Sequence, residues 1–251
     1  MALPLVSEFS LNGYLSLIES IRGQGYQVKR YAEASSSARH LILRHDVDFD
    51  LDQAVRMAEA EAQTGVIATY FILLRTEMYN ALSGEGAKAV IRLAELGHDV
   101  GLHFDATLHA PTKAALAVAV REEAGVLSGI VRKVVNVFSF HRPSPDVLND
   151  EVQVEGMINA YNEQFFRAFG YCSDSQGAWR HGPPLAHPVL AEGRGFHLLT
   201  HPIWWTGEPN ASPQQKLESF LKRRIELLDR EIQRNCRAYR STIQANSSKS
   251  T

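Results

Sequence analysis

Apolar and polar positions along the chain form two kinds of segment. Short runs that are apolar throughout predict strands buried on both faces, as in a parallel sheet covered by helices. Longer segments with apolar residues three or four apart predict amphipathic helices. The predicted strands cover 40–44, 66–74, 99–104, 134–140, 171–174 and 197–205. The predicted helices cover 51–64, 86–96, 112–130 and 213–239.

Local signals mark where several of these helices begin and end. Gly65 and Gly97 follow the first two helices, and glycine readily takes the left-handed conformation that ends a helix. Asp50 and Thr112 stand just before predicted helices, so we expect their side chains to cap free backbone N–H groups. The segment 143–170 has no clear period, and we expect short helices mixed with loops there.

Strands that alternate with helices predict a parallel sheet with helical crossovers, which is an α/β fold. A barrel and an open doubly wound sheet both satisfy the pattern. Neither GxGxxG nor GxxxxGK[ST] follows the first strand, so the usual nucleotide-binding reasons for an open sheet are missing. The 251 residues, 45% of them hydrophobic, suffice for one sizeable core. We expect one α/β domain over 1–240 and a disordered polar tail over 241–251.

Charge, cysteine content and hydropathy narrow the class of protein. Lys and Arg number 26 against 28 Asp and Glu, so the formal charge of −2 gives no reason to expect nucleic acid or an anionic membrane as partner. Cys172 and Cys236 lack CxxC or finger-like spacing, and free thiols fit a reducing compartment. Residues 1–10 lack the basic start of a signal peptide, and no run of about 18 apolar residues predicts a membrane span. We expect a cytoplasmic protein.

Acids and histidines recur where the predicted strands end. In parallel α/β proteins this is the edge of the sheet on which sites are built. Two histidines and one aspartate commonly hold a catalytic divalent metal, with positions left open for water and substrate. A second carboxylate can then act as base and a further histidine as acid. The candidates are Asp46, Asp48, His103, Asp105, His141, Arg142, Asp174 and His201.

Four segments in this order resemble motifs of the polysaccharide deacetylase superfamily, the NodB-homology carbohydrate esterases. They are RHDVD at 44–48, GHDVGLH at 97–103, SFHRP at 139–143 and LLTHP at 198–202. The likeness is greatest to a divergent RHDVD branch associated with surface-polysaccharide and lipopolysaccharide biosynthesis. It implies a distorted (β/α) barrel with an incomplete strand set. It also implies metal-dependent removal of an N-acetyl or O-acetyl group from a sugar.

The resemblance further implies a role for each matching residue. Asp46 corresponds to the general base and His201 to the general acid. Asp48 and His103 correspond to a metal-binding aspartate and the first metal-binding histidine. The implied metal is zinc, with cobalt, manganese and nickel as alternatives. The residues expected to contact the sugar or support the site are Arg44, Asp105, Arg142, Asp174, Trp179 and Trp204.

Departures from the family's pattern leave the third ligand open. Val47 separates two aspartates that are adjacent in the family. Thr107 stands four residues after His103, where the family has its second metal-binding histidine. We expect His141, which ends the neighbouring strand where the family has an arginine, to be the third ligand. His109, on a loop, is the second choice.

Some of these residues have a structural alternative. Arg44 either holds an active-site carboxylate ionised or closes the floor of the barrel. Trp204 either stacks on a sugar ring or belongs to the core, where large aromatics near strand ends are more often found. His98 is expected to be structural and to hydrogen-bond the backbone. His45 is expected to be structural too, with support of the neighbouring acids as the alternative.

We expect a hydrolase that removes an acyl group from an amino sugar linked to a nucleotide or a lipid. A metal-dependent phosphoesterase is one alternative, and it predicts two metals bridged by carboxylates. A degenerate deacetylase that binds a sugar without turnover is another. The helix at 213–239 is expected to pack on the core, and a role in a homodimer is the alternative.

Overall fold

Parallel strands joined by helices dominate this computed structural model, which describes residues 9–145, 152–180, 182–241 and 243. The chain divides into two units, Met1–Asn210 and Ala211–Thr251. The strands of the first unit are β1 (Gln27–Val28), β2 (His40–Val47), β3 (Thr69–Leu73), β4 (Asp99–Phe104), β5 (Val137–Phe140), β6 (Ile158–Asn159), β7 (Gly170–Ser173) and β8 (Phe196–Thr200).

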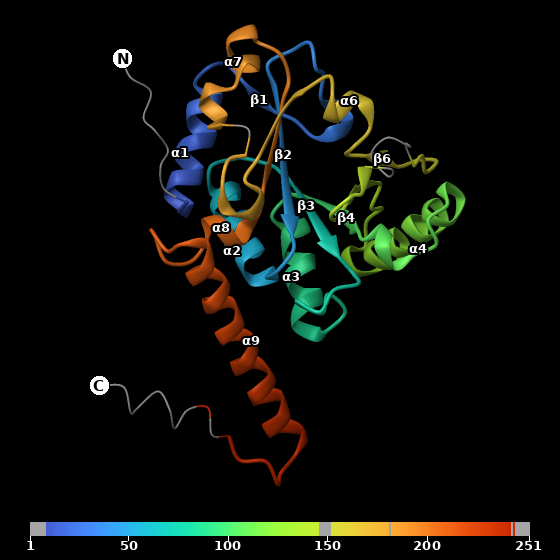
Figure 1. Ribbon diagram of the computed structural model, residues 1–251, viewed down its shortest axis with the longest axis vertical. Coiled ribbons are helices and arrows are strands. Elements are labelled where there is room, and N and C mark those ends of the chain that lie inside the picture. The colour runs from blue at the N-terminus through green and yellow to red at the C-terminus, as the bar shows by residue number, and fades with distance from the viewer. Residues whose placement is uncertain (1–8, 146–151, 181, 242, 244–251) are drawn as a thin grey trace. The chain divides into compact units, whose positions relative to one another are not determined.

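All pairings described between these strands are parallel. The order in the sheet is β6-β5-β4-β3-β2-β8-β7, and β1 pairs with β2. Figure 1 shows β2, β3 and β4 side by side. In the part of the chain that the structure describes, β6 and β7 end the order without pairing with each other. The predicted α/β fold is confirmed as a distorted (β/α) barrel with an incomplete strand set.

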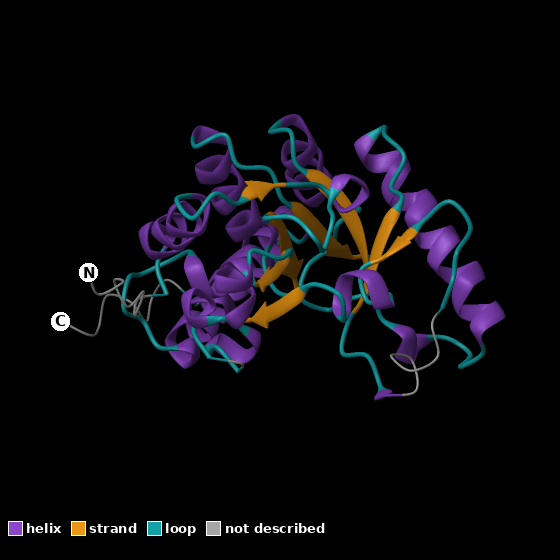
Figure 2. Cartoon of the chain, turned by 90° about the horizontal axis from the view of Figure 1, so that it is seen from above, coloured by secondary structure: helices purple, strands orange, loops and turns teal. Residues whose placement is uncertain are grey.

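Helices connect the strands and lie outside the sheet (Figure 2). Those of the first unit are α1 (Leu11–Arg22), α2 (Leu51–Gln63), α3 (Gly84–Glu95), α4 (Lys113–Val131), α6 (Glu163–Phe166), α7 (Pro188–Glu192) and α8 (Pro202–Trp205). The second unit contains α9 (Pro213–Asn235). None of the helices that the structure describes is long and apolar enough to cross a membrane.

The sheet is buried on both faces, as its continuous apolar strands predict. Every residue of β3 and β8 is buried. Side chains from three strands and from the chain around them fill the inside of the barrel. This core cluster consists of Tyr31, Ile42, Phe71, Val137, Ala160, Phe165 and Phe169.

The predicted helix caps are confirmed. Asp50 accepts hydrogen bonds from the N–H groups of the first turn of α2, and Thr112 does the same for α4. Gly65 and Gly97 have φ values of +67° and +92°, the left-handed region that glycine takes at least cost.

Several predicted boundaries are wrong. The second and fourth strands begin three residues later than predicted, at Thr69 and Val137. The predicted strand 197–205 ends at Thr200, because Pro202 starts the short helix α8. The helix α1 was not predicted. Most of the predicted tail, 241–251, lies outside the described residues.

Candidate active site

Three residues that could bind a metal meet at the carboxyl edge of the sheet. Asp48 follows β2, His103 lies near the end of β4, and His141 is the first residue after β5. One ligand atom from each lies within 4.8 Å of the other two. Parallel strands end at the same edge, so residues far apart in sequence come together here.

The ligand atoms of this cluster face one another closely. Oδ1 of Asp48 lies 3.2 Å from Nε2 of His103 and 3.4 Å from Nδ1 of His141. The two nitrogens are 3.3 Å apart. Among the described residues, Oδ1 of Asp48 is buried without a hydrogen bond of good geometry. Two imidazole nitrogens and one carboxylate oxygen suit zinc or a similar divalent ion, so the residues fit the predicted metal.

Two of the three side chains in this cluster are partly exposed to solvent. The side chains of Asp48 and His141 are 17% and 14% exposed, whereas that of His103 is 2% exposed. Burial alone would raise the pKa of Asp48, but His103, His141 and His201 lower it well below its usual value. Asp48 is therefore ionised, which is the form that binds a metal.

Ser139 orients the imidazole of His103. Its Oγ lies 2.7 Å from Nδ1 of His103, and the two residues pair across β4 and β5. If Nδ1–H donates to this hydroxyl, the lone pair on Nε2 is left for a metal. Sequence reasoning did not assign Ser139 a role. It stands two residues before His141, a spacing that places both side chains on the same face of a strand.

Asp46 lies beside the cluster and is held by Arg44 of the same strand. Nε and Nη2 of Arg44 each donate to one oxygen of Asp46, at 2.8 Å. Arg44 is fully buried, stacks on Tyr161 and also donates to the Tyr161 hydroxyl at 3.2 Å. Of the two roles expected for Arg44, the structure therefore shows the contact with a carboxylate of the candidate site. Oδ2 of Asp46 is 3.5 Å from Nε2 of His103.

The charges around Asp46 decide its protonation state. Burial alone would raise the pKa of this carboxyl group. Arg44, His103 and His201 outweigh burial, so the pKa is lowered. Asp46 is therefore ionised at neutral pH.

His201 faces the cluster from the end of β8 and is oriented by Asp174. Its Nδ1 lies 2.6 Å from Oδ1 of Asp174, and its backbone N–H donates to the same carboxylate at 3.1 Å. Trp205 donates its indole N–H to Oδ2 of Asp174 at 2.7 Å. Nε2 of His201 lies 3.7 Å from Oδ2 of Asp48. This hydrogen bond of Trp205 was not predicted, because no local pattern in the sequence indicates it.

Burial alone would lower the pKa of His201. Asp174, and then Asp48 and Asp46, raise it to about 9. The imidazole is therefore protonated at neutral pH and has a proton to give.

The sequence left two candidates for the third metal ligand, His141 and His109. His141 belongs to the three-residue cluster described above. His109 instead lies 3.1 Å from Oε1 of Glu123 through Nε2, and its ring stacks on Phe104. The geometry therefore favours His141 over His109.

The other predicted site residues are engaged by protein groups. Asp105 accepts hydrogen bonds from the N–H and hydroxyl of Thr107, and Arg142 donates to it at 3.3 Å. Trp179 stacks on Phe9 and lies against Trp205. Trp204 is buried with its ring near that of Phe49. Contact of these residues with a sugar stays a prediction.

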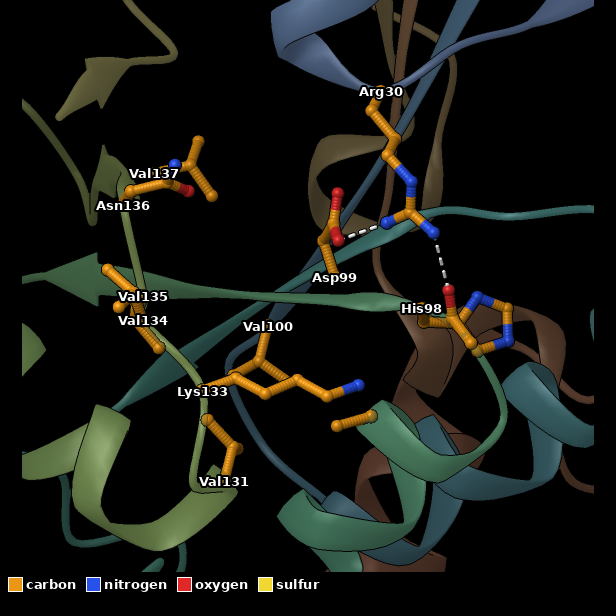
Figure 3. Close-up of a pocket in the computed structure, with 12 residues that line it drawn as sticks. Arg30, His98, Asp99, Val100, Val131, Lys133, Val134, Val135, Asn136 and Val137 are labelled. Carbon is orange, nitrogen blue, oxygen red and sulfur yellow. Dashed lines mark hydrogen bonds and ion pairs between the residues drawn. The ribbon is translucent and has the colours of Figure 1, made fainter.

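A pocket at the opposite, amino ends of β4 and β5 contains none of the candidate ligands. Arg30 extends along it, paired with Asp99 and donating to the Gly97 carbonyl at 2.9 Å (Figure 3). His98 lines the pocket but bonds the backbone, as predicted, accepting from the N–H of Ala68.

Comparison with solved structures finds proteins of similar fold. A family 4 acetyl xylan esterase from Clostridium thermocellum with a cobalt ion is 14% identical, with a TM-score of 0.41, over 73% of this chain and 84% of the esterase. A family 4 carbohydrate esterase from Streptomyces lividans in complex with acetate is 13% identical, with a TM-score of 0.43, over 74% of this chain and 85% of the esterase. A CE4 family pseudoenzyme from Bacillus anthracis is 12% identical, with a TM-score of 0.38, over 77% of this chain and 62% of the pseudoenzyme.

The chain is similar in fold to family 4 carbohydrate esterases. The four sequence motifs resemble the same superfamily, and membership of it and of the RHDVD branch stays a prediction. The chain spans less than two thirds of the length of the pseudoenzyme. No protein-family model and no curated protein matches the sequence. Likeness of this extent describes the fold alone, so the reaction has to follow from the site.

Proposed function

We propose that this chain is a metal-dependent hydrolase that removes an N-acetyl group from an amino sugar. The observation that carries the proposal is the convergence of Asp48, His103 and His141 beside an ionised acid, Asp46, and a protonated histidine, His201. These are the parts that hydrolysis of an amide requires: a metal site, a base and an acid.

Asp48, His103 and His141 would hold the metal, for which zinc is the first choice. When bound, a divalent metal makes water more acidic and polarises the acyl carbonyl. Asp46 takes the proton of the attacking water at a carboxylate oxygen, and Arg44 keeps that carboxylate ionised and fixed in direction.

His201 completes the reaction on the leaving side. Its Nδ1 is bound to Asp174, which leaves Nε2 directed toward the cluster. As the amide C–N bond breaks, Nε2–H gives its proton to the departing amine and acetate is released. Asp174 keeps the imidazole in one orientation and stabilises its positive charge.

The surroundings of the cluster favour one metal over two. A two-metal phosphoesterase holds two cations close together with bridging carboxylates, so a carboxylate already paired with a protein cation is a poor bridge. Asp46 is bound to Arg44 through both oxygens, and Asp174 is bound to His201 and Trp205. Asp105 is bound to Thr107 and Arg142. These engagements support a site for a single ion.

The substrate class rests on the sequence motifs. The order of the four motifs resembles sugar deacetylases, and the RHDVD segment resembles the branch associated with surface polysaccharides. We therefore infer that the substrate is an acetamido sugar carried by a nucleotide or a lipid, as a precursor of such a polymer.

Metal content is the first test. Protein purified without chelator should contain about one transition metal per chain, measured by elemental analysis. His103→Ala should lose it, whereas the matched control His109→Ala should retain it. No metal after incubation with zinc, cobalt or manganese would overturn the proposal, and a ratio near two would favour the phosphoesterase.

Acetate release is the second test. The loaded protein should release acetate from one member of a panel of acetamido-sugar nucleotides and lipid-linked acetamido sugars. Asp46→Asn should abolish release while the metal stays bound. Tight sugar binding without release, unchanged by Asp46→Asn, would identify a non-catalytic sugar-binding protein instead.

A further inference from the structure

The helix α9 carries a line of exposed apolar side chains. Leu221, Ile225, Leu228 and Ile232 are 56%, 50%, 53% and 45% exposed. Exposed leucines and isoleucines that lie in one line are typical of a surface that another molecule covers. None of these residues belongs to the proposed active site.

The spacing of these residues indicates what covers them. They are separated by four, three and four residues, which is the spacing of successive d and a positions in a heptad repeat. Ile225 and Ile232 then stand at a, and Leu221 and Leu228 at d. Helices with this repeat pack their a and d side chains against the a and d side chains of another helix.

The charges beside this apolar line favour a second copy of the same helix. The flanking g positions are Arg224 and Glu231, and the flanking e positions are Lys222 and Asp229. In an antiparallel pair, g positions face g positions and e positions face e positions. With Ile225 opposite Leu228 of the second copy, Arg224 faces Glu231 and Lys222 faces Asp229. Arg224 and Glu231 have opposite charges and are both partly exposed. Asp229 is buried and accepts hydrogen bonds from Gln233 and Tyr239 of its own copy, so the orientation rests on Arg224 and Glu231.

Two other partners fit this pattern less well. In a parallel pair Arg224 would face the buried Asp229, Lys222 would face Leu217 and Glu231 would face Cys236, so no exposed pair of opposite charges forms. A membrane surface would favour basic residues along both edges of the apolar line. Here each edge has one basic and one acidic residue.

We propose that α9 pairs with α9 of a second copy in antiparallel orientation, so that the chain forms a two-fold symmetric homodimer. The apolar line supplies the buried contact, and Arg224 with Glu231 sets the direction and register. Within its own copy Glu231 accepts a hydrogen bond from exposed Arg234 at 2.8 Å, a contact weak enough to exchange. The inference goes beyond the proposed reaction, and neither depends on the other.

Sedimentation velocity of the full chain, over a range of concentrations, tests the dimer. The wild type should sediment with twice the mass of one chain, and Leu228→Lys should sediment as a monomer with an unchanged far-UV circular dichroism spectrum. A wild type that stays monomeric at all concentrations would overturn the proposal. Co-sedimentation of that monomer with phosphatidylglycerol vesicles would assign the apolar line to a membrane surface.

Charge reversal tests the orientation without touching the apolar line. Arg224→Glu and Glu231→Arg should each weaken the dimer by about tenfold, because each places like charges in both symmetry-related pairs. The double variant should recover the dissociation constant of the wild type to within about twofold. Arg230→Glu, on the opposite side of the helix, is the matched control and should change little. A double variant that stays weak would overturn the antiparallel register.

Discussion

The salt bridge between Arg44 and Asp46 joins two residues of one strand whose side chains share a face. Its two hydrogen bonds of 2.8 Å hold a carboxylate that the protein buries almost completely. A buried acid remains ionised only while compensating positive charge lies beside it. The pair therefore gives Asp46 both its charge and its direction before a substrate binds.

Removing the Arg44 guanidinium should show up in the pH dependence of the reaction. The pKa of Asp46 is lowered in the folded protein, so the base is available above that pKa and is lost as the pH falls through it. Arg44→Gln should raise this pKa and move the acid limb of kcat/KM for acetate release to higher pH, by about one unit or more. Arg194→Gln, an exposed arginine, is the control. An unmoved acid limb would mean that Asp46 is not the titrating base.

His197 should make the stability of the fold depend on pH. Burial lowers the pKa of this imidazole to about 3, and its nitrogens contact the Tyr31 hydroxyl at 2.8 Å and the Phe165 carbonyl at 3.0 Å. The unfolded chain takes up a proton below about pH 6.5, whereas the folded protein does not. The stability that neutral His197 provides is thus complete above pH 6.5 and is lost as the pH falls toward 3.

Urea unfolding at a series of pH values measures this effect. Between pH 7 and pH 5 the stability advantage of the wild type over His197→Gln should shrink by about 2 kcal/mol, since one proton corresponds to about 1.4 kcal/mol per pH unit. A constant difference between the wild type and His197→Gln would contradict the buried, neutral state.

At the scale of elements, Glu61 of α2 bonds side chains of three neighbouring elements, α1, β3 and β2. Its carboxylate accepts hydrogen bonds from Tyr14 of α1 at 2.5 Å and from Tyr70 of β3 at 2.6 Å, and it lies 2.9 Å from Nε2 of His45 in β2. Nδ1 of His45 in turn lies 2.7 Å from the hydroxyl of Thr200, the last residue of β8. His45 thus has structural contacts, but with side chains of a covering helix and of β8.

Truncating Glu61 should destabilise the whole fold. Glu61→Ala leaves buried hydroxyl and imidazole groups without their acceptor, so we expect a loss of about 3–5 kcal/mol in the free energy of unfolding. Glu59 also lies in α2, and Glu59→Ala removes its exposed ion pair with Arg92 of α3. This change should lower the free energy of unfolding by less than about 1 kcal/mol. Equal losses in chemical denaturation of the two variants would contradict the role of Glu61.

The elements that the sequence predicted well are those with a strong local signal. Strands buried on both faces appear as continuous apolar runs, and Asp50 and Thr112 mark helix starts by their own chemistry. The end of β8 was missed because apolar residues continue through Pro202 into α8. The helix α1 was missed although its buried side chains, among them Tyr14 and Leu17, lie on one helical face.

The site could be predicted only as far as strand ends could be located. The sequence indicated that the ends of several strands carry ligands, and a parallel sheet brings those ends together. Which histidine completes the cluster depends on the pairing of His103 with Ser139 across β4 and β5, which no local pattern gives. The contact of Glu61 with His45 could not be predicted either, because it too joins separate elements.

At the scale of the whole molecule, the proposed metal would join the end of β2 to the ends of β4 and β5, which β3 separates from β2 in the sheet. Asp48 and His141 directly follow β2 and β5, and His103 lies in β4. A ligand that binds the folded state alone stabilises it in proportion to its occupancy. Metal binding should therefore be measurable as stability, independently of any substrate.

Thermal unfolding with and without zinc is the test of this coupling. At a free zinc concentration of about 100 times its dissociation constant, binding adds about 2.7 kcal/mol, which should raise the Tm by about 5–10 °C. His103→Ala should show no such rise and His109→Ala should show all of it, since only the first belongs to the cluster. Zinc bound at surface histidines would stabilise both variants alike. Loss of the rise in His109→Ala but not in His103→Ala would place the metal with Glu123 and would refute the role of His141.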